Sequence, residues 1–280
     1  MRRLLIASAA ALALSATSAF AADLGIPYYK SPPPPPPPVS WTGCYIDGGF
    51  GYGMWNQDHY TENSVTRVPI TGTDTDGGRG WLGRFGGGCD YQVSPRIVVG
   101  VLGDYDWMSL TGISHQDLTA TPTPFFGING TERETSSWSV GARIGYLVTP
   151  SLLTYFDGGY TQARFGQVSY VNDTTTLGIG TATGLSMPAT TYHGWFIGGG
   201  TEYALDMDWI PIRGLFWRNE YRYASYSGTD IADVCVGGGA TCGAAGTYAY
   251  GEHASKDVQT ITSSLVWRFN WGGPLGGLRE

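Results

Sequence analysis

The sequence has 280 residues, of which only 14% are charged, while 14% are aromatic and 43 are glycine. This composition is poor in helix formers and rich in the residues that strands and turns use, so it predicts an all-β protein. The 23 acidic residues outnumber the 16 basic ones and the formal net charge is −7, which disfavours nucleic-acid binding.

The first 21 residues have the pattern of a secretory signal peptide. Arg2 and Arg3 precede an apolar run from Leu4 to Ala16, and Ala19-Phe20-Ala21 provides a cleavage site after Ala21. A membrane anchor is the alternative, but the run is too short, because a spanning helix needs about 20 apolar residues. Residues 1–21 are therefore expected to direct export.

Residues 22–40 are expected to form a Pro-rich periplasmic linker. The uninterrupted prolines Pro32 to Pro38 favour a polyproline II rod of roughly 20 Å, at about 3.1 Å per residue. A ligand for an SH3-like domain is the alternative, but few domains that bind such ligands are known in the bacterial periplasm. A stiff spacer is the simpler interpretation.

Eight segments in which apolar and polar residues alternate are expected to be strands, each long enough for the roughly 9 to 11 residues of a tilted membrane strand. They are Thr42–Trp55, Trp81–Val93, Ile97–Trp107, Trp138–Val148, Leu152–Phe165, Tyr192–Leu205, Arg213–Ala224 and Val258–Phe269.

The connections between these segments are short at 94–96, 149–151 and 206–211, and long and polar at 56–79, 108–137, 166–190 and 226–256. Short periplasmic turns and long external loops are typical of an eight-stranded antiparallel up-and-down transmembrane β-barrel. The barrel is expected to occupy residues 41–271 and to be followed by a C-terminal tail at 272–280.

Alternation does not show which face points outward, since a soluble lipocalin-like barrel has its apolar face inside. The aromatic residues distinguish a membrane barrel from a soluble one. On strands that alternate in direction, the aromatic residues of the apolar face fall near the two rims of the barrel, where the interfaces of a bilayer would lie. One belt is expected to contain Tyr52, Trp81, Trp107, Trp138, Trp195 and Tyr223, and the other Tyr91, Tyr146, Tyr203, Trp217, Trp267 and Phe269.

The opposite face carries charges of both signs among glycine and serine, which predicts a lumen filled by ion pairs. Glycine would make room there for the long arginine side chains. The expected network consists of Asp47, Arg84, Asp90, Asp104, Asp106, Arg143, Asp157, Glu202, Arg218, Glu220, Arg222 and Arg268.

The four cysteines suggest paired thiols in an exported chain. Cys235 and Cys242 flank a glycine-rich stretch that is flexible enough for a local disulfide. Cys44 and Cys89 lie in adjacent expected strands on the apolar face. The sequence allows either a cross-strand disulfide or two lipid-facing thiols there.

No catalytic, cofactor-binding or metal-ligating residues are expected. His59, His115, His193 and His253 fall in or beside expected external loops, but no two of them have the spacing of metal ligands. His253-Ala254-Ser255 has the His-x-Ser spacing of a lipid A deacylase, although a serine nucleophile also needs an oriented base and an oxyanion donor.

Several strings resemble the alphaproteobacterial outer-membrane immunogenic proteins, a porin-family group of small β-barrels. They are Trp41-Thr-Gly-Cys-Tyr-Ile-Asp-Gly-Gly-Phe-Gly-Tyr-Gly53, Gly194-Trp-Phe-Ile-Gly-Gly-Gly-Thr-Glu-Tyr-Ala204 and Leu265-Val-Trp-Arg-Phe269, together with Ala22-Asp23-Leu24. The resemblance covers nearly the whole mature chain. The sequence departs from the family's pattern at two places. Cys44 stands where the family usually has an aromatic residue, and residues follow Phe269, where the barrel-assembly signal of the family usually ends the chain.

The resemblance implies a non-enzymatic surface antigen of the Gram-negative cell envelope, located in the outer membrane, with structural and interaction roles. A narrow porin-like channel for ions or small solutes is the alternative, since paired arginines and aspartates can form a gate. The expected partners are outer-membrane lipid and lipopolysaccharide, and the barrel-assembly machinery. The sequence indicates neither an external ligand nor an oligomeric state.

Overall fold

The computed structural model describes residues 41–117, 127–173, 178–205, 214–237, 242, 246 and 248–269. They belong to the second of two compact units, Met1–Pro38 and Val39–Glu280. The expected signal peptide and linker, the expected turn at 206–211 and residues 270–280 lie outside the described residues. Among those described, no helix is long and apolar enough to cross a membrane.

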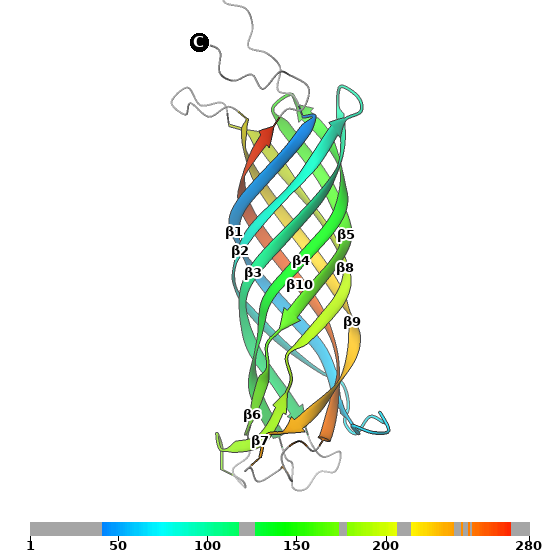
Figure 1. Cartoon of the computed structure of the whole chain (residues 1–280), viewed down its shortest axis with the longest axis vertical. Helices are drawn as coiled ribbons and strands as arrows, with labels where there is room; N and C mark the ends of the chain where they lie inside the picture. Colours follow the sequence, from blue (N-terminus) through cyan, green and yellow to red (C-terminus); the bar gives the residue numbers. More distant parts are fainter. Residues whose placement is uncertain are drawn as a thin grey trace, which may run out of the picture. The chain divides into compact units, whose positions relative to one another are not determined.

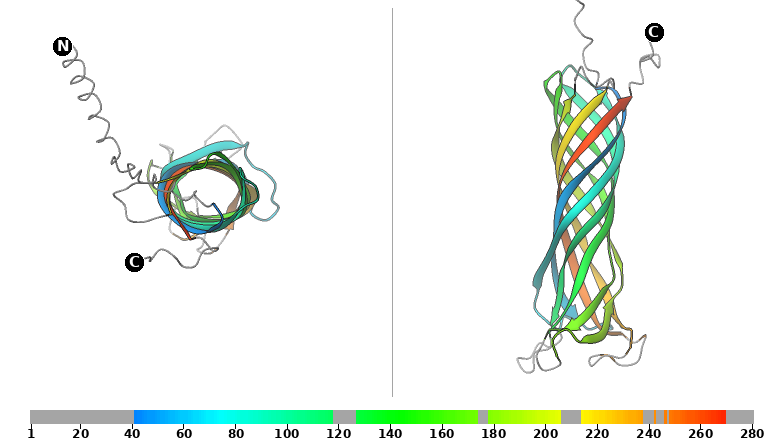
Figure 2. Two further views of the ribbon diagram at one scale, coloured as in Figure 1. Left: turned by 90° about the horizontal axis from the view of Figure 1, so that it is seen from above. Right: turned by 90° about the vertical axis from the view of Figure 1, so that its left-hand side faces the viewer.

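Eight long strands form a closed antiparallel ring. In ring order they are β1 Gly43–Glu62, β2 Asp74–Gln92, β3 Ile97–Asp117, β4 Gly127–Thr149, β5 Leu152–Phe165, β8 Thr190–Ala204, β9 Leu215–Cys235 and β10 Tyr248–Phe269. β10 pairs with β1 along its length and closes the ring, which is seen end-on in Figure 2 and from the side in Figure 1. The expected eight-stranded transmembrane barrel is confirmed.

Most strands are longer than predicted at one end. β5 has the expected bounds, but β1 continues to Glu62, β3 to Asp117 and β9 to Cys235. Two short strands, β6 Val168–Asn172 and β7 Ala182–Met187, also form a hairpin inside the stretch expected to be a loop, at the lower end of Figure 1. The predicted extent of the long loops was therefore wrong, because strand pairing continues where apolar alternation stops.

The exterior of the barrel is apolar over its middle. Phe50, Phe85, Ile144, Phe156 and Leu265 are each more than half exposed on five different strands. A soluble protein would not leave so large an apolar band uncovered, whereas hydrocarbon is its natural solvent.

The twelve predicted belt residues all point outward. Ten are exposed, and the other two, Tyr223 and Phe269, pack against Trp195 and Trp267 with ring centroids 5.9 and 4.6 Å apart. In the register, Tyr52 lies opposite Trp81 and Tyr203 lies opposite Trp217, at the two ends of the apolar band.

The distance between the belts matches a membrane. On β2, Trp81 and Tyr91 are ten residues apart, which at about 3.4 Å per residue and a tilt of about 40° corresponds to a height of roughly 25 Å. We take the segments between the belts as membrane-spanning, for example 81–91 of β2, 138–146 of β4 and 195–203 of β8. Beyond the first belt, most outward residues are polar, as at Asn56, Asp58, Thr111 and Thr131, although Ile113 is also exposed there. The barrel therefore projects past the membrane at the end that carries β6 and β7, which we call the external end.

Two disulfides lie within the described residues. Cys44 of β1 and Cys89 of β2 are direct partners in the register and are bonded across the outer face, with Cα atoms 3.9 Å apart. The alternative of two lipid-facing thiols is thus not what the structure contains. Cys235, at the end of β9, is bonded to Cys242, with Cα atoms 5.6 Å apart.

We predict that protein purified from membranes contains no reactive thiol. Maleimide treatment of denatured, unreduced protein should add no mass, and treatment after reduction should label all four cysteines, because an oxidising compartment maintains both bonds. In a Cys44→Ser variant, one label should appear on Cys89 without reduction. Labelling of unreduced wild-type protein would contradict the bond of whichever cysteines carry the label.

Candidate functional site

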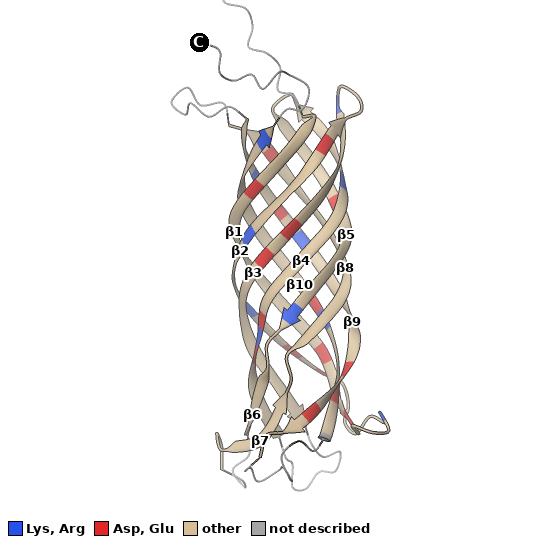
Figure 3. Ribbon diagram, viewed as in Figure 1, with Lys and Arg blue, Asp and Glu red and all other residues tan. Residues whose placement is uncertain are grey.

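The barrel lumen gathers the charged residues that the sequence places on one face. The twelve expected network residues come from all eight ring strands, and their side chains lie inside the barrel. Figure 3 shows acidic and basic positions distributed over the strands along the barrel. Alternation accounts for this placement, because each of them lies next to outward residues of the apolar band.

Glu202 of β8 is the centre of the network on the periplasmic side. Its carboxylate pairs with Arg143 of β4 at 3.3 Å, Arg218 of β9 at 3.0 Å and Arg268 of β10 at 2.6 Å. Asp90 of β2 accepts hydrogen bonds from Arg143 and, at 2.7 Å, from Arg268. Three guanidinium groups thus share two fully buried carboxylates.

Aromatic rings separate these guanidinium groups. Tyr45 lies between Arg143 and Arg218, whose guanidinium carbons are 4.7 and 4.6 Å from the centre of its ring. Tyr155 donates a hydrogen bond of 2.8 Å to Glu220, and its ring centre is 5.1 Å from Arg143. Cation–π contact in a desolvated site helps to offset the repulsion between like charges.

Arg84 and Arg222 organise the other half of the network. Arg84 makes a bidentate pair with Asp106, with both distances 2.8 Å, and reaches Glu220 at 2.6 Å. Arg222 contacts Asp104 at 2.9 Å and Glu220 at 2.9 Å.

Two further pairs complete the network. Arg222 contacts Asp157 at 3.4 Å, and Arg218 contacts Asp47 at 3.0 Å. Tyr155 joins the two halves, because its hydroxyl donates to Glu220 and its ring lies against Arg143. All twelve expected residues therefore belong to one connected set.

Glycine makes room for this network, at the carboxylates in particular. A Cβ at Gly100 would overlap Asp90 Oδ1, and a Cβ at Gly198 would overlap Asp157 Oδ1. The expectation that glycine accommodates the arginines was thus too narrow, because the crowded atoms at these two positions belong to aspartates.

A cluster of buried apolar side chains lies in the lumen on the periplasmic side of the network. Trp41, Phe216, Val98, Leu147 and Leu153 form a buried cluster, in which the rings of Trp41 and Phe216 are 5.0 Å apart. The indole nitrogen of Trp41 donates a hydrogen bond of 3.0 Å to the carbonyl of Pro150 in the β4–β5 turn.

A second apolar layer lies on the external side. Trp55, Phe165 and Tyr192 are buried around Lys256, whose ammonium nitrogen is 4.9, 4.2 and 5.1 Å from the three ring centres. Lys256 also donates hydrogen bonds to Gln57 and, at 2.8 Å, to Glu132.

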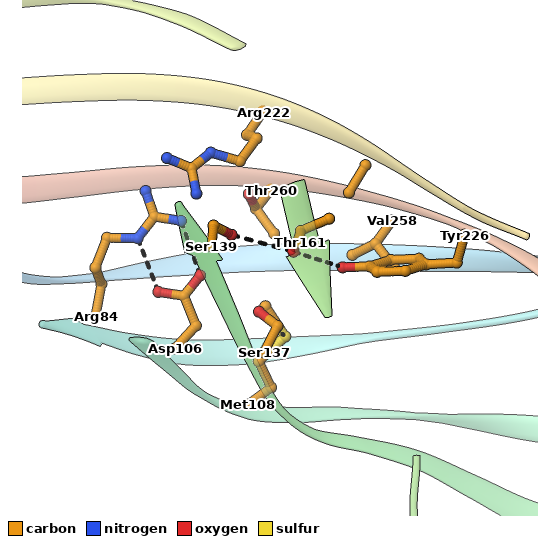
Figure 4. A pocket seen from close by; sticks show the side chains of 11 residues that line it. Arg84, Asp106, Met108, Ser137, Ser139, Thr161, Arg222, Tyr226, Val258 and Thr260 are labelled. Carbon is orange, nitrogen blue, oxygen red and sulfur yellow. Dashed lines mark hydrogen bonds and ion pairs between the residues drawn. The ribbon is translucent and has the colours of Figure 1, made fainter. Parts of the chain in front are cut away.

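Between the network and this layer lies a small cavity beside Arg84 and Asp106. Figure 4 shows its polar wall, where Ser139 donates to Thr161 at 3.1 Å and Thr161 meets the hydroxyl of Tyr226 at 3.3 Å. Met108 and Val258, which belong to the apolar layer, also line this cavity.

A further buried polar cluster occupies the external extension. Glu252 accepts hydrogen bonds from Gln57 at 2.6 Å, Gln116 at 2.5 Å and Tyr170 at 3.1 Å. His59 lies 3.1 Å from Asp76 and 3.4 Å from Glu252.

These contacts affect titration in the extension. Burial lowers the pKa of His59, but the hydrogen bond to Asp76 and the charge of Glu252 raise it more, so the net shift is upward. Burial, with the charge of Glu252, raises the pKa of Asp233 well above its ordinary value.

Sequence reasoning missed this external cluster. Its residues fall in stretches interpreted as loops, where inward Gln57 and His59 alternate with outward Asn56 and Asp58. Both faces are polar there, so hydrophobic alternation gives no signal.

The histidines do not come together. His59 is inside the barrel, whereas His193 and His253 lie on its outer surface. His253 pairs with Asp230, and Ser255 donates its hydrogen bond to the carbonyl of Asp58 and not to His253. Within the described residues, no three or more His, Cys, Asp or Glu side chains are placed to hold a metal ion.

Comparison with known proteins gives the same architecture. Residues 7–269 match the family model described as "Outer membrane protein beta-barrel domain". The 31 kDa outer-membrane immunogenic proteins of Brucella melitensis and Brucella suis are each 27% identical over 239 residues, which cover 84% of this chain and 91% of theirs.

Among solved structures, the outer membrane protein OprG of Pseudomonas aeruginosa is 12% identical, with a TM-score of 0.48 over 82% of this chain and 97% of that one. The expected resemblance to outer-membrane immunogenic proteins is confirmed by the family match and the Brucella relatives. The chain belongs to the family of outer membrane proteins with this β-barrel domain, and its location is the outer membrane.

Proposed function

We propose that this outer membrane protein is a surface protein with structural and interaction roles in the envelope, and that its lumen does not conduct. The observation that carries the proposal is the succession of layers inside the barrel. The Trp41 and Phe216 cluster, the network around Glu202, and the aromatic layer around Lys256 each fill the lumen at a different depth. Eight strands leave an interior that side chains of this size can occupy completely.

The external end is the part available for interaction. It consists of the projecting strands, whose outward side chains are largely polar, and the β6–β7 hairpin, most of which is buried. The proposal includes no catalytic role, since Ser255 and His253 are bonded to different partners. It also includes insertion by the barrel-assembly machinery, as for other barrels of this membrane.

Single-channel recording in planar bilayers tests the closed lumen. Purified wild-type protein should give no large, stable conductance steps, because both apolar layers and the paired charges would have to separate before ions could pass. Thr201→Ala, which changes an outward residue beside Glu202, should behave in the same way.

The alternative function, a narrow channel for ions or small solutes, makes the opposite prediction. Under it, wild-type protein conducts, and Arg143→Ala or Arg218→Ala increases the conductance sharply by removing a gate residue. Stable steps from wild-type protein would therefore replace the proposed function by this alternative.

A further inference from the structure

Three arginines project from one wall of the barrel just beyond the external belt. They are Arg79 of β2, Arg133 of β4 and Arg164 of β5, and all three are exposed. Within the described part of the chain none of them makes an ion pair, although Arg133 donates a hydrogen bond of 2.9 Å to Ser109. The five arginines of the lumen network all pair with carboxylates, so these three differ in having no carboxylate partner among the described residues.

The strand register places the three arginines close together. Arg79 lies opposite Thr111, Thr111 lies opposite Arg133, and Ser136, three residues from Arg133, lies opposite Arg164. Two strand spacings separate Arg79 from Arg133, or about 10 Å along the row. The arginines thus form one patch across the four neighbouring strands β2 to β5.

Polar aromatic residues continue the patch toward the membrane. Trp138 donates a hydrogen bond of 2.6 Å to Gln162, and the hydroxyl of Tyr160 lies 2.6 Å from His193 Nδ1. The rings of Trp138 and Tyr160 are 5.4 Å apart on the outer surface. Flat ring faces beside amide and imidazole groups suit a sugar, which presents apolar C–H faces and a rim of hydroxyls.

Outward acidic residues beyond the belt lie mainly on other strands of the ring. Asp58 of β1, Asp230 of β9 and Asp257 of β10 point outward beyond the belt, whereas the arginines lie on β2, β4 and β5. On the side of the arginines, Asp117 and Asp173 lie near His115, at the far end of β3 from the belt. An anionic group should therefore bind at the arginines, close to the belt.

The geometry points to a site on β2 to β5 for a phosphorylated glycolipid of the outer leaflet, in which the arginines bind phosphate and the Trp138 and Tyr160 rings contact the sugar. The site rests on the orientation of the barrel in the proposed function. It is at the right depth, because the arginines lie two to five residues beyond Trp81, Tyr160 and Trp138, at the level of lipid headgroups. Guanidinium groups bind phosphate by charge-assisted, often bidentate hydrogen bonds.

The test measures binding of bisphosphorylated lipid A to the purified, detergent-solubilised full chain. The triple variant Arg79→Ala, Arg133→Ala, Arg164→Ala should bind at least about tenfold more weakly than wild type, if each exposed charge pair contributes a few-fold. Arg96→Ala is the matched control, since Arg96 is an exposed arginine that contacts Tyr146 at the other belt, and it should bind as wild type does. Replacement of the three arginines by lysine should restore part of the affinity.

Two further probes identify the ligand chemistry. Dephosphorylated lipid A should bind the wild type as weakly as lipid A binds the triple variant, and phosphatidylglycerol should bind more weakly than lipid A. Equal binding of lipid A by wild type and triple variant would overturn the site, and equal binding of phosphatidylglycerol would overturn the assignment to a glycolipid. Heat-modifiable electrophoresis separates these outcomes from a failure to fold, because a folded barrel migrates differently before and after boiling.

Discussion

Replacement of Glu202 by glutamine should lower the free energy of unfolding by about 3 to 5 kcal/mol, the usual cost of breaking a buried ion-pair cluster by removing one partner. Glu202 is fully buried and contacts Arg143, Arg218 and Arg268. A neutral amide accepts fewer charge-assisted hydrogen bonds, and its NH₂ group would face one of the guanidinium groups. Denaturant unfolding in detergent micelles, followed by tryptophan fluorescence, measures the loss.

Two variants show whether the loss comes from unpaired charge. Thr201→Ala, on the outer face of the same strand, should change the free energy of unfolding by less than about 0.5 kcal/mol. The double variant Glu202→Gln, Arg143→Met should cost less than the sum of its parts, because it removes an excess positive charge. A loss below about 1 kcal/mol for Glu202→Gln alone would mean that the cluster is as weak as a hydrated surface pair.

The membrane-spanning part of the fold was predictable because two faces of opposite polarity alternate there. Ile144 faces lipid and Arg143 faces the lumen, so one residue of slippage would place a charge in hydrocarbon and an isoleucine among ions. Such a strong constraint leaves a clear pattern in the sequence. It explains why β5, most of which lies between the belts, has its predicted bounds.

The partners within the lumen could not be predicted in the same way. Arg84 binds Glu220, which is 136 residues away, and Arg218 binds Asp47, which is 171 residues away. Which inward side chains meet across a barrel depends on strand tilt and stagger, and these are set by the pairing of all eight strands together. The sequence therefore indicates the members of the network but not their contacts.

The external extension was missed for a different reason. Outside the membrane its outer face meets water, while its inner face contains both aromatic residues such as Trp55 and polar ones such as Gln57 and Glu252. The two faces no longer differ consistently in polarity, and the β6–β7 hairpin is too short for a periodic signal. Only the strand pairing of the folded protein reveals that this region is a continuation of the barrel.

One member of that extension, Glu134 of β4, should make the stability depend on pH. It is fully buried, and neither of its carboxylate oxygens has a hydrogen-bond partner among the described residues. Burial, with the charge of Asp106, raises the pKa of Glu134 from 4.5 to about 8, although Lys256 opposes the shift. Glu132 and the buried Tyr226 also face it.

The direction of the pH effect follows from this raised pKa. Between pH 4.5 and about 8 the folded chain holds a proton at Glu134 that the unfolded chain has released. The contribution of this group to the free energy of unfolding is therefore largest below pH 4.5 and is lost as the pH rises to about 8. At about 1.4 kcal/mol per pH unit, the loss amounts to roughly 4 to 5 kcal/mol across the window. We therefore expect Glu134→Gln, which is neutral at every pH, to gain stability relative to wild type as the pH rises from 5 to 8.5.

The comparison between the two proteins isolates Glu134 from the other titrating groups, which they share. Unfolding curves of wild type and Glu134→Gln should nearly coincide at pH 4.5 and separate progressively above it, with the variant the more stable. Thr131→Ala, an outward change on the same strand, should keep the pH dependence of wild type. If the two curves stay parallel from pH 4.5 to 8.5, Glu134 is already ionised at low pH, and the interior of the extension must then be wet enough to hydrate an unpaired carboxylate.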